Sequence, residues 1–304
     1  MARSRLLRTQ RSFLNRTRVA LRKPPLYQEA FWYRGGFLVG LPTYRGAMDL
    51  DSFEQLDPNP AATQIKRMLQ DIILWNERTS PRSLQRAIGP SEIGDPCDRR
   101  IAYRLAGTEP VNVYGDPWPA IVGTAIHSWL ETAINRFQAE TGHQGWVTEA
   151  RVQPDPLVQG RSDVFYERTG TVVDFKTTSS DTIKKLNRGD PPSPSYVTQI
   201  NLYGRGHELA GRDVKNVCLV YYARSGWLND AFVWHDTYKP EIAARALTRM
   251  YDIGFHLLDL DIENRPEKFA DILPTPGDNC IWCPMFSRDM DPTVKASRDG
   301  CPGR

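Results

Sequence analysis

The segment from Gly160 to Ser180 limits the possible fold most, because it reads as two strands joined by a tight turn. Its arms, Asp163–Tyr166 and Thr171–Lys176, are rich in β-branched and aromatic residues, and a glycine stands where the chain must reverse. Asp174 and Lys176 are two residues apart, so both side chains leave the same face of the sheet. A carboxylate and an ammonium on a half-buried strand lower stability unless they are paired or bind a ligand.

The two aspartates of this hairpin predict a site for a divalent cation. Asp163 and Asp174 lie on adjacent arms and can converge on Mg²⁺ or Mn²⁺, which prefer oxygen ligands. The carbonyl oxygen of Phe175 is a further candidate ligand. We expect Lys176 to hold the attacking water and to stabilise charge on a scissile phosphate. The alternative is an Asp–Lys ion pair on the surface of an edge strand, beside a turn aspartate.

Length and charge bound the class of protein. The 304 residues, 40% of them hydrophobic, are enough for one large domain, or one domain with appendages, around a proper core. No apolar run approaches the length of a membrane helix. Residues 1–47 hold ten Lys/Arg and one acid, which leaves 29 basic and 35 acidic residues in the rest. The body is therefore not a basic nucleic-acid binder by bulk charge, and any attraction of DNA must come from local patches. The candidates are Arg99, Arg100, Lys184, Lys185 and Arg188.

The N-terminal extension, residues 1–47, has three open interpretations. It is a transit peptide of the mitochondrial type, a nucleic-acid-binding arm, or an upstream extension outside the native protein if Met48 is the true start. No apolar secretory segment follows its arginines, and the odd number of cysteines, five, fits metal ligation in a reducing compartment better than a disulfide framework.

Hydrophobic periodicity predicts the remaining elements. Helices are expected over 61–76, 120–140, 196–209 and 240–260, with a further helix after Asp95 as N-cap, so that Cys97 lies in its first turn. Strands are expected over 146–153, 215–223 and 227–234, and a polar loop over 181–195. The stripe of helix 120–140 towards the core consists of Ile126, Leu130, Ala133, Ile134 and Phe137.

The hairpin resembles a known family of nucleases. Gly160-Arg-Ser-Asp163 before the first arm and Asp174-Phe-Lys-Thr-Thr178 along the second match the hallmark of the PD-(D/E)XK nucleases, and more closely of RecB-type nuclease domains. In such domains a histidine upstream, in a G-x-x-x-H motif, is a metal ligand. Gly123-Thr-Ala-Ile-His127 resembles this motif, and without the resemblance His127 would read as a half-buried core histidine. Glu131, one turn later, is a capping or salt-bridge residue on this reading.

One further motif follows the family order. Gln199 and Tyr203 share a helix face and resemble the Q-x-x-x-Y motif, whose residues contact DNA or brace the catalytic centre. Taken alone, they would be a polar helix surface with a core tyrosine.

The cysteines resemble those of the iron–sulfur members of this clan, in which one cysteine precedes the nuclease core and three follow it. Three of the four, Cys280, Cys283 and Cys301, lie near the end of the chain, and Cys97 is the candidate fourth ligand. The resemblance implies a [4Fe–4S] cluster; the alternatives are Zn²⁺ held by the same thiolates, or free thiols. The 17 residues between Cys283 and Cys301 are more than is usual in that family. Cys218, inside an apolar strand, reads as a core thiol.

The resemblance covers about Ser91 to Pro302 and is closest to the CRISPR-associated exonucleases of the fourth family and their phage-encoded relatives. It implies an α/β, restriction-endonuclease-like fold: a mixed central sheet flanked by helices, with a helical N-terminal segment tied to the C-terminal tail by four cysteines. We expect a basic extension over 1–47, a helical segment over 48–118, a nuclease core over 119–263 and a tail over 264–304.

The implied function is that of a Mg²⁺- or Mn²⁺-dependent DNA exonuclease in recombination, repair or spacer acquisition, in the cytoplasm of a prokaryote or of a phage-infected cell. The implied partners are single-stranded DNA or duplex ends and proteins of recombination or CRISPR adaptation, with no membrane. The alternative is a DNA-end-binding recombination accessory protein with little or no nuclease activity.

Overall fold

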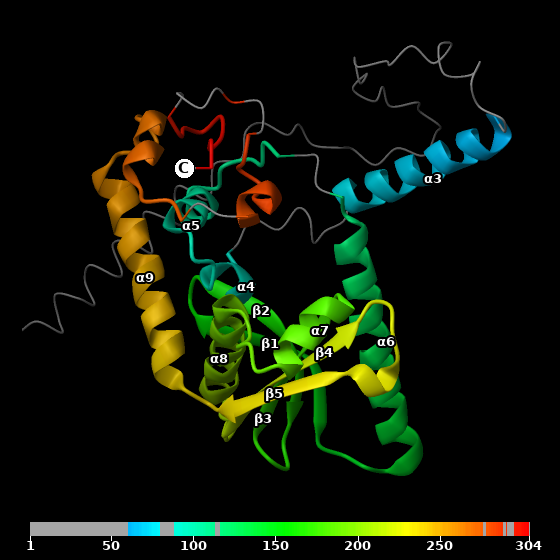
Figure 1. Ribbon diagram of the computed structural model, residues 1–304. Helices are drawn as coiled ribbons and strands as arrows, with labels where there is room; N and C mark the ends of the chain where they lie inside the picture. Colours follow the sequence, from blue (N-terminus) through cyan, green and yellow to red (C-terminus); the bar gives the residue numbers. More distant parts are fainter. Residues whose placement is uncertain are drawn as a thin grey trace, which may run out of the picture. The chain divides into compact units, whose positions relative to one another are not determined.

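The computed structural model describes residues 60–79, 88–112, 116–275, 278–287, 290 and 295–303 (Figure 1). The basic extension lies outside these residues. The chain divides into two compact units, Met1–Asn76 and Glu77–Arg304. Helix α3 (Pro60–Thr79) confirms the helix expected over 61–76. Within the described residues, no helix is long and apolar enough to cross a membrane.

The larger unit is built on a mixed sheet of five strands in the order β1-β2-β3-β4-β5. The strands are β1 (Trp146–Asp155), β2 (Val158–Tyr166), β3 (Thr171–Thr178), β4 (Asn216–Ala223) and β5 (Phe232–Thr237). All neighbouring pairs are antiparallel except β3 and β4, which are parallel. A parallel pair needs a long crossover connection, and the chain uses it to lay a helix on the sheet. The mixed, helix-flanked sheet confirms the expected architecture.

The crossover contains α7 (Ser180–Asn187) and α8 (Pro194–Leu209). Helix α8 packs against the sheet with its largest contact on β1, and Ile200 and Tyr203 join Val172 and Leu219 in one core cluster. Helix α6 (Trp118–Thr141) contacts β1 and β3. A Cβ on its Gly123 would lie 3.2 Å from the Thr177 hydroxyl, on the opposite face of β3 from Val172. Helices α6 and α8 therefore cover opposite faces of the sheet.

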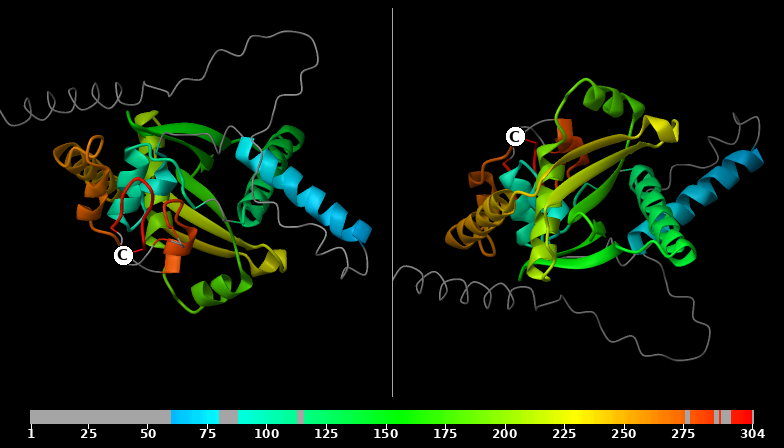
Figure 2. Two further views of the ribbon diagram at one scale, coloured as in Figure 1. Left: turned by 90° about the horizontal axis from the view of Figure 1, so that it is seen from above. Right: turned by 90° about the horizontal axis from the view of Figure 1, so that it is seen from below.

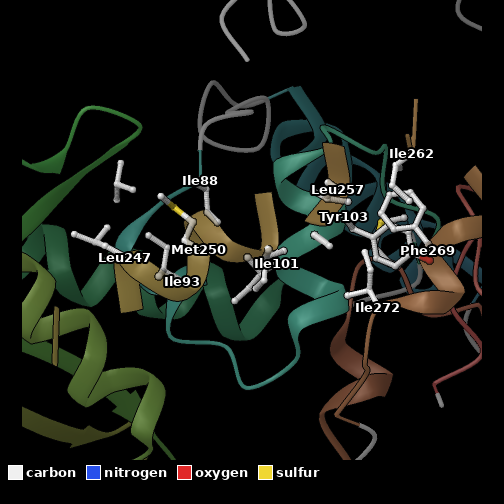
Figure 3. Packing of buried hydrophobic residues seen from close by; sticks show 14 of the residues in the cluster. Ile88, Ile93, Ile101, Tyr103, Leu247, Met250, Leu257, Ile262, Phe269 and Ile272 are labelled. Atoms are coloured by element: carbon white, nitrogen blue, oxygen red, sulfur yellow. The ribbon is translucent and has the colours of Figure 1, made fainter. Parts of the chain in front are cut away.

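A second core joins the chain before the sheet to the chain after it. It packs α4 (Pro90–Ile93), α5 (Asp98–Leu105) and α9 (Pro240–Asp259) with the 3₁₀ turn η2 (Pro266–Asp271). Tyr103 stacks on Phe269 with ring centroids 4.2 Å apart, and Figure 3 shows this pair beside Ile272. Two further 3₁₀ turns are η1 (Leu228–Asp230) and η3 (Asp278–Trp282).

Four expectations about these elements were wrong. The loop expected over 181–195 contains α7, because Ser179 caps it through Thr182 N–H and its Ile183 and Leu186 are buried. Trp227 lies outside β5, since the chain reverses through η1 before the strand begins.

The other two corrections concern caps and burial. Asp95 is not an N-cap: its Oδ1 accepts from Cys97 N at 2.9 Å, and the helix begins one residue after Cys97, which is itself the N-cap. None of the side chains described on α6 is fully buried, and Phe137 is half exposed, because the helix rests on the sheet along one side only.

Candidate active site

The site lies where β2 and β3 separate. Their last paired residues are Val164 and Val173, so the next residues along, Asp163 and Asp174, stand where the ladder opens. The N–H group of Phe175 donates to Asp163 Oδ2 at 2.7 Å. A side-chain carboxylate thus replaces the missing strand-to-strand bond, which fixes Asp163 in the opening.

Asp174 is a buried carboxylate beside an ammonium. It is 1% exposed, and its Oδ2 lies 2.5 Å from Lys176 Nζ. The pKa of Asp174 is raised to about 6, chiefly by burial; the Lys176 ammonium opposes this shift, and the Asp163 charge adds to it. The two side chains share one face of β3, as their spacing predicted.

Lys176 is held by a chain of polar groups from α8. Its Nζ donates to Gln199 Oε1 at 2.8 Å, and Gln199 Nε2 donates to Tyr203 Oη at 2.9 Å. The ring of Tyr196 lies under the ammonium, with its centroid 4.5 Å away. Burial raises the pKa of Tyr203 well above its usual range, so its hydroxyl stays protonated. Gln199 and Tyr203 are both buried, a position suited to bracing the lysine rather than to contacting DNA.

His127 reaches the site from the other face of the sheet. Gly123, one turn earlier, has no side chain to hold α6 away from Thr177 at the end of β3. His127 Nδ1 therefore lies 3.3 Å from Asp163 Oδ1. The hydrogen bond that His127 donates to the Asp163 carboxylate raises the pKa of His127 against the effect of burial.

Sterics also explain why position 160, three residues before Asp163, is a glycine. A Cβ at this position would lie 2.9 Å from the ring of Pro90 in α4 and 3.4 Å from Tyr203. Such a contact with Pro90 is closer than side chains tolerate, so only glycine lets α4 and α8 approach this part of β2.

Two residues near the site were absent from the sequence prediction. Tyr196 lies three residues before Gln199 on α8, and this spacing was a usable signal for a shared face. Glu149 lies on β1 between the residues that pair with Val164 and Ser162, and its φ of 47° is rare for a residue with a side chain. Burial raises the pKa of Glu149, as do the charges of Asp163 and Glu131.

Asp163 and Asp174 offer the oxygen ligands that a hard divalent cation prefers. In the described residues, no three His, Cys, Asp or Glu side chains are placed together so that they could hold a metal ion. His127 and Asp163 instead contact each other. Asp174 Oδ2, however, is buried, and its contact within the described part of the chain is the ion pair with Lys176 Nζ. A buried carboxylate oxygen satisfied only by an ion pair fits a neighbouring cation.

The cysteines lie on segments that pack together. Cys97 Sγ accepts from Thr275 N at 3.4 Å, and Cys301 Sγ accepts from Arg99 Nη1 at 3.5 Å. Cys283 packs against the same core as Cys301. Cys280 lies one turn earlier, with its carbonyl accepting from Cys283 N at 2.9 Å. None of the five cysteines forms a disulfide bond within the described part of the chain. Backbone and guanidinium donors directed at sulfur are suited to thiolates.

The basic residues proposed for DNA divide into two groups. Arg99 is buried and donates to the carbonyls of Ile272 and Ala270, so its assignment as a surface cation was wrong. Arg100 pairs with Asp95 at 2.9 Å. The cations of α7 are exposed: Lys184, Lys185 and Arg188.

No protein-family model matches the chain, and no curated protein matches it either. Among solved structures it is similar to an alkaline exonuclease, LHK-Exo, from Laribacter hongkongensis, at 17% identity and a TM-score of 0.40, over 61% of this chain and 94% of that one. It is also similar to SSO0001, at 18% identity and a TM-score of 0.43, over 76% and 97%.

A third similar structure is a phage-related exonuclease from Haemophilus somnus 129PT, at 12% identity and a TM-score of 0.35, over 53% of this chain and 81% of that one. The function of this chain rests on its own site residues.

Proposed function

We propose that this protein is a metal-dependent DNA exonuclease of prokaryotic or phage recombination, repair or spacer acquisition. One observation carries the proposal: buried Asp174 and partly buried Lys176, braced by Gln199, stand beside Asp163 where β2 and β3 separate. This constellation suits phosphodiester hydrolysis, in which carboxylates hold a cation and an ammonium meets negative charge.

Asp163, Asp174, His127 and the carbonyl oxygen of Phe175 would hold one or two Mg²⁺ or Mn²⁺ ions. The chemistry that such a cation supplies when bound is acidification of an attacking water and neutralisation of charge on the phosphoryl group. The roles of Lys176, Gln199 and Tyr203 follow from their contacts.

Lys176 would meet the charge that develops on the phosphate. Its side chain is 13% exposed and so remains partly accessible to a substrate, while Asp174 and Gln199 contact its ammonium. Tyr203 fixes the amide of Gln199 and has no free role as an acid, because its pKa is raised. An ordered donor costs little reorganisation during the reaction.

The proposal is tested with end-labelled single-stranded and duplex DNA in Mg²⁺ or Mn²⁺. We expect Lys176→Ala to lower kcat by on the order of 100-fold or more. Lys215→Ala is the matched control, since Lys215 pairs with Asp213 on the surface before β4. Covalently closed circular DNA should stay intact if the activity starts from ends.

Equal DNA degradation by the wild-type protein and by Lys176→Ala would contradict the catalytic assignment. Tight binding to DNA ends without cleavage in either metal would instead support the recombination accessory function.

We also propose that Cys97, Cys280, Cys283 and Cys301 bind a [4Fe–4S] cluster. The support is that α5 and the tail already pack through a shared core, which brings the segments bearing these thiols together. Chemical analysis of protein purified without oxygen should find iron and sulfide, with broad visible absorption that Cys97→Ala removes. Zinc without iron would contradict the cluster.

A further inference from the structure

The turn between β4 and β5 presents two large apolar side chains to solvent. Trp227 is 82% exposed and its neighbour Leu228 is 76% exposed. Scattered apolar residues are common on surfaces, but an adjacent Trp–Leu pair at such exposure favours an interaction site.

Hydrogen bonds order the backbone of this turn, residues 224–231. Trp227 N donates to Asp230 Oδ2 at 3.2 Å, and Asp230 N donates back to the Trp227 carbonyl at 3.0 Å. The turn is anchored beside α7, because Ser180 Oγ donates to the Ser225 carbonyl at 2.9 Å. These bonds fix the backbone of the turn on which the two exposed side chains stand.

The turn leaves the sheet at the end that carries the candidate site. Strand β4 runs parallel to β3 with Tyr221 opposite Lys176, and Arg224 N donates to the Thr178 carbonyl at 2.9 Å. Both views in Figure 2 show the turn (yellow) beside α7, with α6 on the other side of the sheet. Helix α7, which begins at this contact with Ser180, carries exposed Lys185, and exposed Arg188 follows its last residue.

We infer that Trp227 and Leu228 form a stacking platform for unpaired bases of the DNA strand whose phosphate lies at Lys176. The inference rests on the proposed function and names its substrate class: single-stranded DNA, or the unpaired end of a duplex. Every base has an apolar face that stacks on an aromatic ring, while the neighbouring cations meet the phosphates. Such a platform is tolerant of sequence.

Binding is measured without cleavage, in the Lys176→Ala background with chelator, by fluorescence anisotropy of labelled oligothymidylate and of a blunt duplex. We expect Trp227→Ala to raise Kd for the single strand by on the order of 10-fold. Trp227→Phe should keep most of the affinity, and the blunt duplex should be affected less. Leu209→Ala, which removes an exposed leucine at the far end of α8, is the matched control for Leu228→Ala.

Unchanged single-strand affinity in Trp227→Ala would overturn the inference, as would a loss of self-association on sedimentation without an effect on DNA. Cleavage by the protein with native Lys176 separates the two proposals. If it degrades DNA and Trp227→Ala leaves KM for single strands unaltered, only the platform fails. If it neither binds nor degrades DNA, both fail.

Discussion

At the scale of single residues, the site depends on polar groups that are buried and satisfied by one another. Lys176 is held by Asp174 and by Gln199, and Gln199 in turn by Tyr203. Each hydrogen bond restricts the next side chain in this series. A change at Tyr203 should therefore alter the position of the Lys176 ammonium.

Removing the Tyr203 hydroxyl tests this chain. We expect Tyr203→Phe to lower kcat by about 10-fold with little change in KM, because Lys176 loses its fixed position. Tyr251→Phe is the control, since it removes a hydroxyl bonded to Asp155 away from the site. Equal kcat values for the two variants would show that Tyr203 only stabilises the fold.

His207 predicts a loss of stability in acid. It is fully buried, stacks on Phe165, and accepts from Arg212. Burial, and then Arg212, lower its pKa to about 4. The folded state resists protonation, so stability is full above the unfolded pKa of about 6.5 and falls as pH drops towards 4.

The loss should reach about 3 kcal/mol at pH 4, since each unit of pKa difference corresponds to about 1.4 kcal/mol. Urea unfolding at several pH values measures it. The free energy of unfolding should depend less steeply on pH in His207→Gln. The steep dependence should persist in His256→Gln, which changes an exposed residue of α9. An unchanged slope in His207→Gln would assign the acid sensitivity to other groups.

At the scale of elements, the approach of α8 to the sheet depends on glycine. A Cβ on Gly206 would lie 2.6 Å from Val152 Cβ of β1, closer than atoms can pack. The helix therefore lies on the strand with backbone close to backbone, and this fixes the height of Gln199 above β3.

Gly206→Ala should therefore destabilise the protein by about 2 kcal/mol, as overpacked cores do. At an uncrowded helix position the same change would stabilise the protein by about 1 kcal/mol. The sign of the change in stability therefore shows whether Gly206 is tightly packed against β1. Thermal and urea unfolding give it. A stabilised variant would contradict the close contact between α8 and β1.

At the scale of the larger unit, α5 and the tail are held together by hydrogen bonds and aromatic packing. Buried Arg99 donates to the Ile272 carbonyl at 3.0 Å and to the Ala270 carbonyl at 3.2 Å, next to the stacked Tyr103 and Phe269. These contacts join residues more than 170 positions apart in the chain.

Arg99→Met should cost about 3 kcal/mol, because two buried carbonyls lose a charged donor. It should also speed proteolysis in the tail, measured by limited digestion and mass spectrometry. Arg100→Met should cost less than about 1 kcal/mol, since its ion pair with Asp95 is partly exposed. Similar effects of the two changes would refute a special role for Arg99.

The sequence by itself determined the hairpin, the shared face of Asp174 and Lys176, and most of the long helices, because periodicity and turn chemistry are local. It did not show α7, since a short helix among lysines and prolines has little periodic signal, nor the turn that exposes Trp227.

Only the tertiary structure decided the rest. Arg99 is buried, Tyr203 braces Gln199, and His127 meets Asp163 from the opposite face of the sheet. The physical reason is that each outcome depends on how closely distant segments approach, and therefore on contacts such as Gly160 with Pro90. Spacing along the chain predicts which side chains share a face of a helix or strand. Tertiary packing determines which residues that face contacts.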